Sequence, residues 1–286
     1  MADLAKILAQ TVAATLEKFA ASKLRADEIA VTLMALGEHL VLAHHRGDAP
    51  VYPASVVKLF YLVAAHQQME DGIIADTTEV RRALHDMIVH SGNEATGYVL
   101  DLLTDTTSGP ELPVAELAAW HEKRNAVNRY FQARGYPEIN ANRKTWHDGP
   151  YGRDQQAVAQ FMPAKNSLTT NATARLLVEI ATGNCVSAAR SAQMMDLLKR
   201  DFTSRADHQA CEFIGAALPP TAKLWSKAGY MSTARHDAAV IEPAEGAKFV
   251  LVIFTVNHSA EKEIIPELAR MILGRVTRVI QGAGGR

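Results

Sequence analysis

Hydrophobic positions near the two ends of the chain predict a terminal helix and a set of strands. At the start they recur at helical spacing, which predicts an amphipathic helix over residues 3–22. Two apolar runs at 28–36 and 39–44 then flank Gly37-Glu38, a pattern typical of a β-hairpin. The C-terminal part predicts three strands and a closing helix, at 223–229, 237–241, 249–256 and 264–276, with turns at Arg235-His236 and 243–246.

The middle of the chain is dominated by helical periodicity. Helices are predicted over residues 55–70, 77–90, 94–103, 112–133, 170–182 and 188–198. The helix at 94–103 is expected to turn Ala95, Tyr98, Val99 and Leu102 inward. Residues 135–170 are rich in Asn, Gly and Pro and lack periodicity, which predicts a long loop, and loops of that length are usually functional or mobile.

Strands at both ends and helices between them predict an α+β fold. The simplest arrangement is one antiparallel sheet built from both chain ends, flanked by helices, with an all-helical lobe inserted. We expect a sheet lobe of residues 1–48 and 205–286, and a helical lobe of 49–204 that carries the long loop. The two lobes would form one intertwined catalytic unit.

Composition and charge narrow the possible partners. Hydrophobic residues make up 48% of the 286 residues, which is ample for a core, and the formal net charge is -1. That balance argues against a nucleic-acid binder or a polybasic membrane protein, and no apolar run is long enough to span a bilayer. The expected partner is a small-molecule substrate.

Cysteines and paired histidines give no sign of a metal or cofactor. Cys185 and Cys211 lack metal-type spacing, so two free thiols are expected and a disulfide is not implied. His44 and His45 are adjacent on a predicted strand, where neighbouring side chains point to opposite faces. With no third ligand near them, we predict no metal site and no cofactor.

The stretch from Tyr52 to Lys58 is the strongest candidate for chemistry. Pro53 ends any preceding helix, so Ser55 is expected near a helix N-terminus, where free N–H groups favour a developing negative charge. Lys58 follows three residues later, on the same helical face. A hydroxyl nucleophile needs a base, and a lysine can serve if burial lowers its pKa toward neutrality.

The spacing alone is weak support, because the chain contains it twice. Ser259-Ala260-Glu261-Lys262 repeats it, and there Ser259 is expected to cap the C-terminal helix while Lys262 is solvated. Ser55 differs because it precedes a buried apolar run and has suitable partners further along the chain.

Those partners are two short motifs, Ser91-x-Asn93 and Lys227-x-Gly229. Ser91 can relay a proton to a leaving group, and the Asn93 amide can hold a substrate carbonyl. Each motif alone is equally a turn between helices or the end of a strand. Because the two motifs follow Ser55-x-x-Lys58 in this order along the chain, the three together favour acyl transfer as the reaction.

The ordered set resembles the serine β-lactamase and penicillin-binding-protein superfamily, closest to the class A β-lactamases. The similarity covers nearly the whole chain and extends to His90–Ala95 and Asp237–Ile241 around the second and third motifs. The resemblance implies an acyl-enzyme on a β-lactam and a link to antibiotic resistance. The implied roles are nucleophile for Ser55, base for Lys58, proton shuttle for Ser91, substrate binding for Asn93, Lys227 and Gly229, and an oxyanion hole from the N–H groups of Ser55 and Tyr230.

Several positions depart from the family pattern. Gly92 stands where the family usually has an aspartate, and Ala228 stands where it has Thr or Ser. The family's deacylating glutamate is missing from the 135–170 loop beyond Glu138, where the acids are Asp148 and Asp154. Asp154 is the candidate base, and a loop-stabilising or solvated acid is the alternative reading of that residue.

Three functional hypotheses remain. The first is a β-lactamase-like serine hydrolase with slow deacylation, and the second a D-alanyl peptidase, esterase or glutaminase with the same site. The third is a penicillin-binding sensor domain that stays acylated. The compartment stays open, because the resemblance implies a periplasmic or secreted protein, whereas the lack of a visible signal peptide would indicate a cytoplasmic one. The sequence does not predict an oligomeric state.

Overall fold

The chain is organised as two units, one built around a sheet and one of helices. The computed structural model describes residues 2–36, 41–162, 164–244 and 248–283. The sheet unit comprises Met1–Val56, Thr169–Thr182 and Leu198–Arg286, and the helical unit comprises Val57–Leu168 and Gly183–Leu197. The predicted turn at Gly37-Glu38 and Gly246 in the turn at 243–246 lie outside the described residues.

The sheet unit contains one antiparallel sheet drawn from both chain ends. Its strand order is β2-β1-β6-β5-β4-β3, and every neighbouring pair is antiparallel. The strands are β1 (Ile29–Ala35), β2 (Val41–His45), β3 (Lys199–Arg200), β4 (Lys223–Met231), β5 (Ala234–Glu242) and β6 (Phe249–Val256). Residues 29–35 pair with 249–255, which joins the two ends of the chain. The predicted α+β fold is confirmed.

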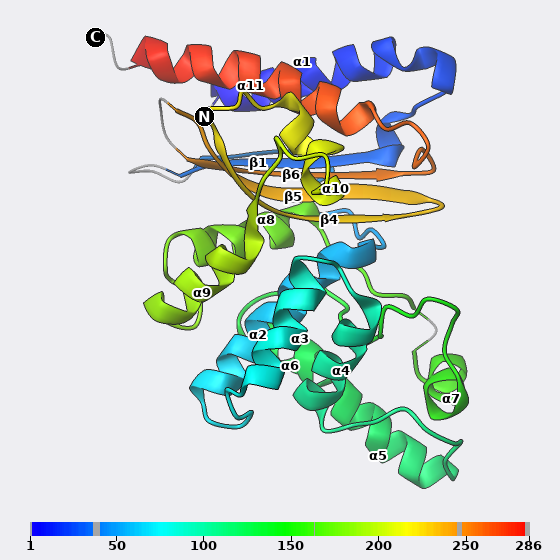
Figure 1. Cartoon of the computed structure of the whole chain (residues 1–286). Helices are drawn as coiled ribbons and strands as arrows, with labels where there is room; N and C mark the ends of the chain where they lie inside the picture. The colour runs from blue at the N-terminus through cyan, green and yellow to red at the C-terminus, as the bar shows by residue number, and fades with distance from the viewer. Residues whose placement is uncertain (1, 37–40, 163, 245–247, 284–286) are drawn as a thin grey trace. The chain divides into compact units, whose positions relative to one another are not determined.

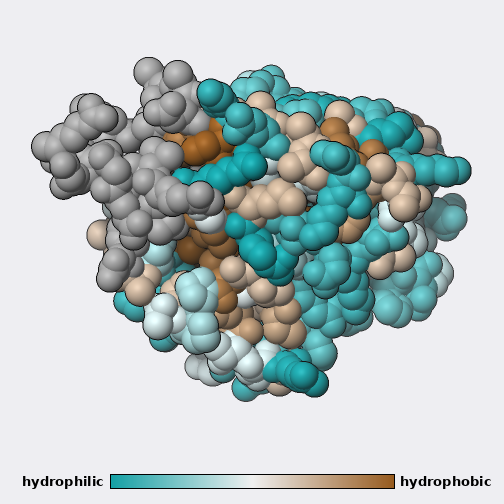
Figure 2. All heavy atoms as spheres, turned by 90° about the horizontal axis from the view of Figure 1, so that it is seen from above, coloured by the Kyte–Doolittle hydropathy of each residue, from teal (hydrophilic) through white to brown (hydrophobic). Residues whose placement is uncertain are grey.

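Helices cover both faces of this sheet. α1 (Ala2–Lys18) and α11 (Ile264–Ala283) lie together on one face, and α8 (Thr170–Ala181) packs against β1, β5 and β6 on the other (Figure 1). Viewed from the side of α1 and α11, hydrophilic side chains cover much of the visible surface, with hydrophobic ones between them (Figure 2). Leu8 and Val12 of α1 and Leu268 and Ile272 of α11 are buried in the core beneath.

The helical unit is built around α2 (Lys58–Glu70). Every residue from Lys58 to His66 is buried, because this helix is contacted by α3, α4 and α6. The remaining helices of the unit are α3 (Thr78–Ile88), α4 (Asn93–Thr104), α5 (Val114–Arg124), α6 (Ala126–Ala133), α7 (Gly152–Gln160) and α9 (Ala188–Leu198, whose last residue belongs to the sheet unit). A helix that is apolar all round must be enclosed by others, which explains the run after Lys58.

Three predicted helical features are wrong in detail. The helix at 112–133 is divided into α5 and α6 at Asn125, whose side chain bonds to the carbonyl and ring of His121. The 135–170 loop contains α7, which its polar composition concealed. Tyr98 is 43% exposed, and Val99, Leu100 and Leu103 form the buried side of α4 instead.

Two predicted turns or caps are also wrong. Arg235 and His236 lie inside β5 and are buried, so the chain reverses at Ser232-Thr233. Two adjacent polar residues are typical of a turn, but inside β5 these two bond to the carbonyls of Glu212 and Tyr52, which come from elsewhere in the chain. Ser259 lies five residues before α11 and donates to the carbonyl of Ser232, so it does not cap the helix.

The units divide the chain differently from the predicted lobes in three places, because residues 49–56, 169–182 and 198–204 belong to the sheet unit. Residues 169–182 belong to the sheet unit, because α8 packs on the sheet although its sequence neighbours are helical. Both cysteines are free thiols, with Cys185 buried and Cys211 half-buried. Within the described residues, no helix combines the length and apolar character needed to cross a bilayer.

Candidate active site

The segment before α2 presents Ser55 at the start of a helical turn. Residues Ala54–Val57 form a 3-10 turn that runs directly into α2, so the predicted helix over 55–70 is confirmed with a tighter first turn. The N–H of Val56 donates to the carbonyl of Pro53 at 3.0 Å, and Ala54 has a φ of +46°. Ser55 itself is half-buried, between fully buried neighbours.

Lys58 is held by three acceptors, two on Ser91 between α3 and α4 and one on Asn93, the first residue of α4. Its Nζ donates to the carbonyl oxygen of Ser91 at 2.6 Å, to the Oδ1 of Asn93 at 2.9 Å and to the Oγ of Ser91 at 3.2 Å. The lysine is fully buried. The structure therefore brings together three of the predicted site residues within the helical unit.

The environment of Lys58 favours its neutral amine. Burial lowers its pKa from the usual 10.5 to about 7, because a buried ammonium loses its hydration, and the carboxylate of Glu94 opposes this shift. A lysine that titrates near neutral pH can take a proton from a hydroxyl. The sequence analysis required that burial lower the pKa of Lys58, and in the structure Lys58 is buried.

The backbone of Ser91 and Gly92 sets the geometry around Lys58. Ser91 has a φ of +57°, a left-handed conformation uncommon for serine, and it turns the chain between α3 and α4. Residues held in such conformations often lie at functional sites. A Cβ on Gly92 would lie 3.4 Å from the carbonyl oxygen of Asp86 and 3.7 Å from the Cβ of Ala95, so the space does not require glycine there.

Within the sheet unit, Gly229 of β4 lies directly against the turn that carries Ser55. A Cβ on this glycine would come within 2.8 Å of the backbone nitrogen of Ser55 and of the carbonyl oxygen of Pro53. Real Cβ atoms do not approach so closely, so only glycine permits this contact. Tyr230, the next residue, is 59% exposed at the end of the strand. The structure thus brings Ser55 and Gly229 together, with Tyr230 beside them.

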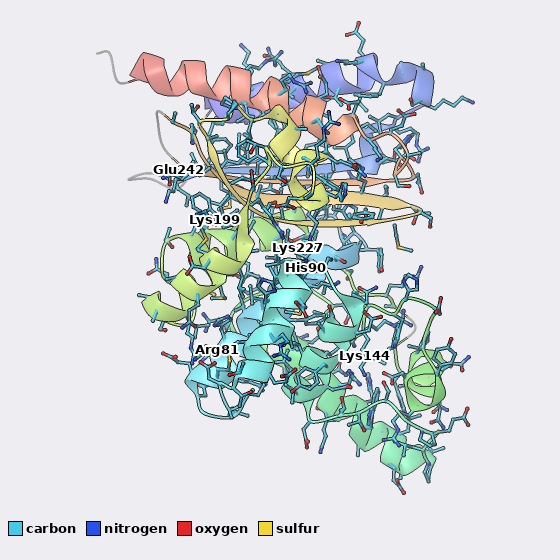
Figure 3. The ribbon with its side chains drawn as sticks, in the orientation of Figure 1. Arg81, His90, Lys144, Lys199, Lys227 and Glu242 are labelled. Carbon is cyan, nitrogen blue, oxygen red and sulfur yellow. The ribbon has the colours of Figure 1, made fainter. Side chains whose placement is uncertain are left out.

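Lys227 is buried on β4 and has a partner that the sequence analysis missed (Figure 3). Its Nζ donates to the side-chain oxygen of Gln209 on α10 (His208–Cys211) and to the carbonyl of Ala228 at 2.7 Å. Ala228 points into the core beneath α1 and α11. Gln209 lies 18 residues before Lys227, on a four-residue helix, so no local pattern could have revealed the pair.

His236 is a second residue that the sequence analysis did not identify. It is fully buried on β5, opposite Gly229 in the register. Its Nδ1 accepts the N–H of Thr255 at 3.1 Å, which fixes the proton on Nε2, and Nε2 donates to the carbonyl of Tyr52 at 2.8 Å. Burial lowers its pKa to about 4, so the neutral ring holds the segment that leads to Ser55.

Asp154 occupies a different environment from the other candidates. It lies in the first turn of α7, is 2% exposed, and its Oδ1 is 3.5 Å from the guanidinium of buried Arg124. Arg124 also bonds to Asp101 at 2.9 Å. This arrangement favours the alternative reading of Asp154 as an acid that holds the loop to the helices.

Two pockets adjoin the candidate residues, one in each unit. In the helical unit, a pocket of about 410 Å³ is lined by Asn93, Glu94 and the loop residues Lys144 to His147. In the sheet unit, one of about 440 Å³ is lined by Tyr230, Met231 and Arg235. Concave sites with a few polar groups are the usual place for a small ligand.

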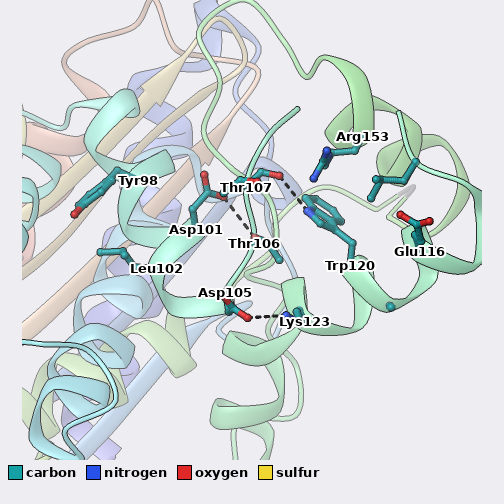
Figure 4. Close-up of a pocket in the computed structure, with 12 residues that line it drawn as sticks. Tyr98, Asp101, Leu102, Asp105, Thr106, Thr107, Glu116, Trp120, Lys123 and Arg153 are labelled. Carbon is teal, nitrogen blue, oxygen red and sulfur yellow. Dashed lines mark hydrogen bonds and ion pairs between the residues drawn. The ribbon is translucent and has the colours of Figure 1, made fainter. Parts of the chain in front are cut away.

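A larger pocket of the helical unit, of about 750 Å³, contains none of the predicted site residues (Figure 4). Its charged and polar groups are largely engaged with one another. Asp105 pairs with Lys123 at 2.6 Å, and the Trp120 Nε1 donates to the carbonyl of Thr107 at 3.1 Å. We assign it no chemistry.

Comparison with known proteins identifies a family and a fold for this chain. Residues 8–276 match the family model described as "Beta-lactamase enzyme family". Among solved structures, a β-lactamase from Sphaerobacter thermophilus DSM 20745 is similar at 20% identity and a TM-score of 0.69, over 94% of this chain and 97% of that one. No curated protein sequence matches the chain.

Two further solved structures have the same fold. A variant of the last common ancestor of the class A β-lactamases of Gram-negative bacteria is 18% identical, with a TM-score of 0.68 over 94% of this chain and 99% of that one. A mutant of PBP-A, in an acyl-enzyme complex with penicillin G, is 16% identical, with a TM-score of 0.67 over 96% and 97%. Identities this low establish the fold alone.

Proposed function

Because this chain belongs to the beta-lactamase enzyme family, we propose that it is a serine hydrolase that acts through an acyl-enzyme on Ser55. The main support for this proposal is Lys58, a buried lysine with a pKa of about 7 whose amine donates hydrogen bonds to Ser91 and Asn93. Ser55 lies one helical turn before Lys58 along a continuous helical segment. The pair therefore meets the local requirement for a serine and its base.

In the proposed acylation, protons move from Ser55 to Lys58, from Lys58 to Ser91 and from Ser91 to the leaving group. The neutral amine of Lys58 accepts the proton of the Ser55 hydroxyl while the Oγ attacks the substrate carbonyl carbon. The C–N or C–O bond then breaks as Ser91 gives its hydroxyl proton to the leaving atom and regains one from the Lys58 ammonium. The 3.2 Å distance between Lys58 Nζ and Ser91 Oγ supports this path.

The remaining residues are proposed to bind the substrate. The N–H groups of Ser55 and Tyr230 would stabilise the oxyanion, and the contact of Gly229 with the Ser55 nitrogen supports this role. The amide of Asn93 would hold the acyl side of the substrate beside the pocket that it lines. Lys227 would attract a substrate carboxylate with its positive charge.

The substrate is proposed to be a β-lactam or a related amide or ester, with slow deacylation. Slow deacylation follows because Asp154 is buried and paired with Arg124 instead of being free to activate water.

The D-alanyl peptidase, esterase or glutaminase alternative is favoured by one observation. Lys227 already bonds to Gln209, and Ala228 supplies no hydroxyl, so recognition of a β-lactam carboxylate is weaker than in the family pattern. The lasting acyl adduct of a sensor domain is the other alternative, favoured by the environment of Asp154.

A substrate panel tests these proposals. Penicillin G, a chromogenic ester, a D-alanyl-D-alanine peptide and glutamine are each mixed with the protein and with Ser55→Ala. We expect turnover or stoichiometric acylation by penicillin, lost in Ser55→Ala. If the ester, the peptide or glutamine is turned over faster than penicillin, that compound represents the substrate class of the enzyme. Turnover that survives in Ser55→Ala would overturn the role of Ser55.

A further inference from the structure

Three potential metal ligands gather at the C-terminal end of α3, apart from the residues that act in the proposed reaction. They are His85 and Asp86 on the helix and His90 in the segment that follows it (Figure 3 labels His90). One ligand atom of each side chain lies within 4.8 Å of the other two. We propose that this cluster binds a divalent transition-metal ion of the zinc type, such as Zn²⁺, Ni²⁺, Co²⁺ or Cu²⁺.

The backbone fixes the positions from which these side chains extend. α3 ends at Ile88, and the left-handed conformation of Ser91 turns the chain back. The N–H of Gly92 then donates to the carbonyl of Asp86 at 2.9 Å. As a result, the ring centroids of His85 and His90 lie 5.3 Å apart, although the two residues are five positions apart in the sequence. The cluster is a product of the fold and is not a helical i, i+4 pair.

The distances are close to those of a coordinated ion. The Nδ1 of His85 is 3.2 Å from the Oδ1 of Asp86, which is near the ~3.3 Å between two ligands of a tetrahedral zinc site. The remaining atoms must close by roughly 1–1.5 Å for the same geometry. The side chains of His85 and Asp86 are 49% and 46% exposed, so they are free to rotate by that amount. Water would fill the fourth position.

The donor set selects the class of ion. Two imidazoles and one carboxylate suit Zn²⁺, Cu²⁺, Ni²⁺ and Co²⁺, whereas Mg²⁺ and Ca²⁺ prefer oxygen ligands throughout. The location adds a favourable field, because the C-terminal end of a helix carries a partial negative charge that attracts a cation. His90 directly precedes Ser91, whose carbonyl accepts a hydrogen bond from the Lys58 amine, so one ligand of the bound ion would be the neighbour of a Lys58 partner in the sequence.

Copper binding to the full chain, purified without a histidine tag, tests the proposal. One equivalent of Cu²⁺ is expected to give an electron paramagnetic resonance spectrum with coupling to two imidazole nitrogens, and His90→Ala should reduce this to one. Zn²⁺ titration by calorimetry should show one site, weakened at least about tenfold in His90→Ala and in His85→Ala. His208→Ala is the matched control, because His208 is exposed in the sheet unit and outside the cluster.

The opposite results are equally clear. The proposal is overturned if the double variant His85→Ala/His90→Ala binds Zn²⁺ as tightly as the original protein, or if His208→Ala weakens binding as much as His90→Ala does. Thermal melts of each metal-free variant should match the original protein, because the replaced side chains are exposed. The readouts need no enzymatic activity, so they stand apart from the proposed hydrolase function.

Discussion

The Nζ of Lys58 lies 2.6 Å from the carbonyl oxygen of Ser91, so a buried lysine is bonded to a strained backbone turn. This hydrogen bond, with those to Asn93 and to the Ser91 hydroxyl, gives the lysine partners without giving it a counter-charge in direct contact. Burial therefore dominates its titration, and the amine is neutral in a large fraction of molecules near pH 7.

The first prediction concerns the pH dependence of acylation. The rate constant for acylation of Ser55 by a penicillin should rise about tenfold per pH unit below pH ~7 and level off above it, because only the neutral Lys58 amine is a base. Glu94→Gln removes the carboxylate that raises this pKa, so the inflection should move to lower pH. A rate that does not change between about pH 5 and pH 9 would contradict the role of Lys58.

The second prediction concerns the contact between Gly229 and the turn that carries Ser55. Gly229→Ala should lower the acylation rate on the order of a hundredfold, because its Cβ would displace the Ser55 backbone nitrogen. Gly274→Ala in α11 is the matched control, since a Cβ there meets open space, and it should acylate normally. Stopped-flow acylation measures both variants. Normal acylation by Gly229→Ala would show that this backbone contact is irrelevant.

The third prediction separates stability from catalysis at Asp154. Asp154→Asn should lower the free energy of unfolding by about 2 kcal/mol, because buried Arg124 loses a charged partner but keeps Asp101. The lifetime of an acyl adduct should not change. Asp148→Asn, at an exposed position of the same loop, should leave stability unaltered. Urea unfolding and adduct lifetime decide the matter, and a longer-lived adduct with unchanged stability would restore Asp154 as the base.

The fourth prediction concerns His236 and acid stability. Its pKa is lowered from 6.5 to about 4 in the folded protein, so below pH 6.5 the unfolded chain binds a proton that the folded chain excludes. The stability of the original protein relative to His236→Gln should therefore decrease as the pH falls from about 6.5 to 4, by up to about 3 kcal/mol. Urea unfolding of both proteins over this range measures the difference, which would stay constant if His236 titrated normally.

The sequence identified those candidate site residues that lie close together along the chain. Ser55 and Lys58 are three residues apart and Ser91 and Asn93 are two apart, so each pair could be named as a candidate from nearby positions and from the order of the motifs along the chain. Hydrophobic periodicity likewise predicted α2 and the strands β4 and β6. These features depend on neighbours within a few residues, which is the range that a single sequence reveals.

The residues that were missed depend on contacts across long stretches of chain. His236 bonds to Tyr52 over 184 residues, and Arg124 pairs with Asp154 over 30. His236 and Arg124 are buried against partners from distant parts of the chain, and no pattern within a few residues of either one reveals those partners. His85 and His90 also escaped notice, because the left-handed turn at Ser91 brings them together.

The central claim is that Ser55 forms an acyl-enzyme, and intact-protein mass against time after mixing with penicillin G tests it most directly. We expect one adduct of the mass of the intact penicillin, absent in Ser55→Ala and persisting for minutes or longer because deacylation is slow. An adduct that clears within seconds would keep Ser55 as nucleophile and contradict slow deacylation. No adduct, with no hydrolysis of the penicillin, or an adduct that remains in Ser55→Ala, would contradict the claim itself.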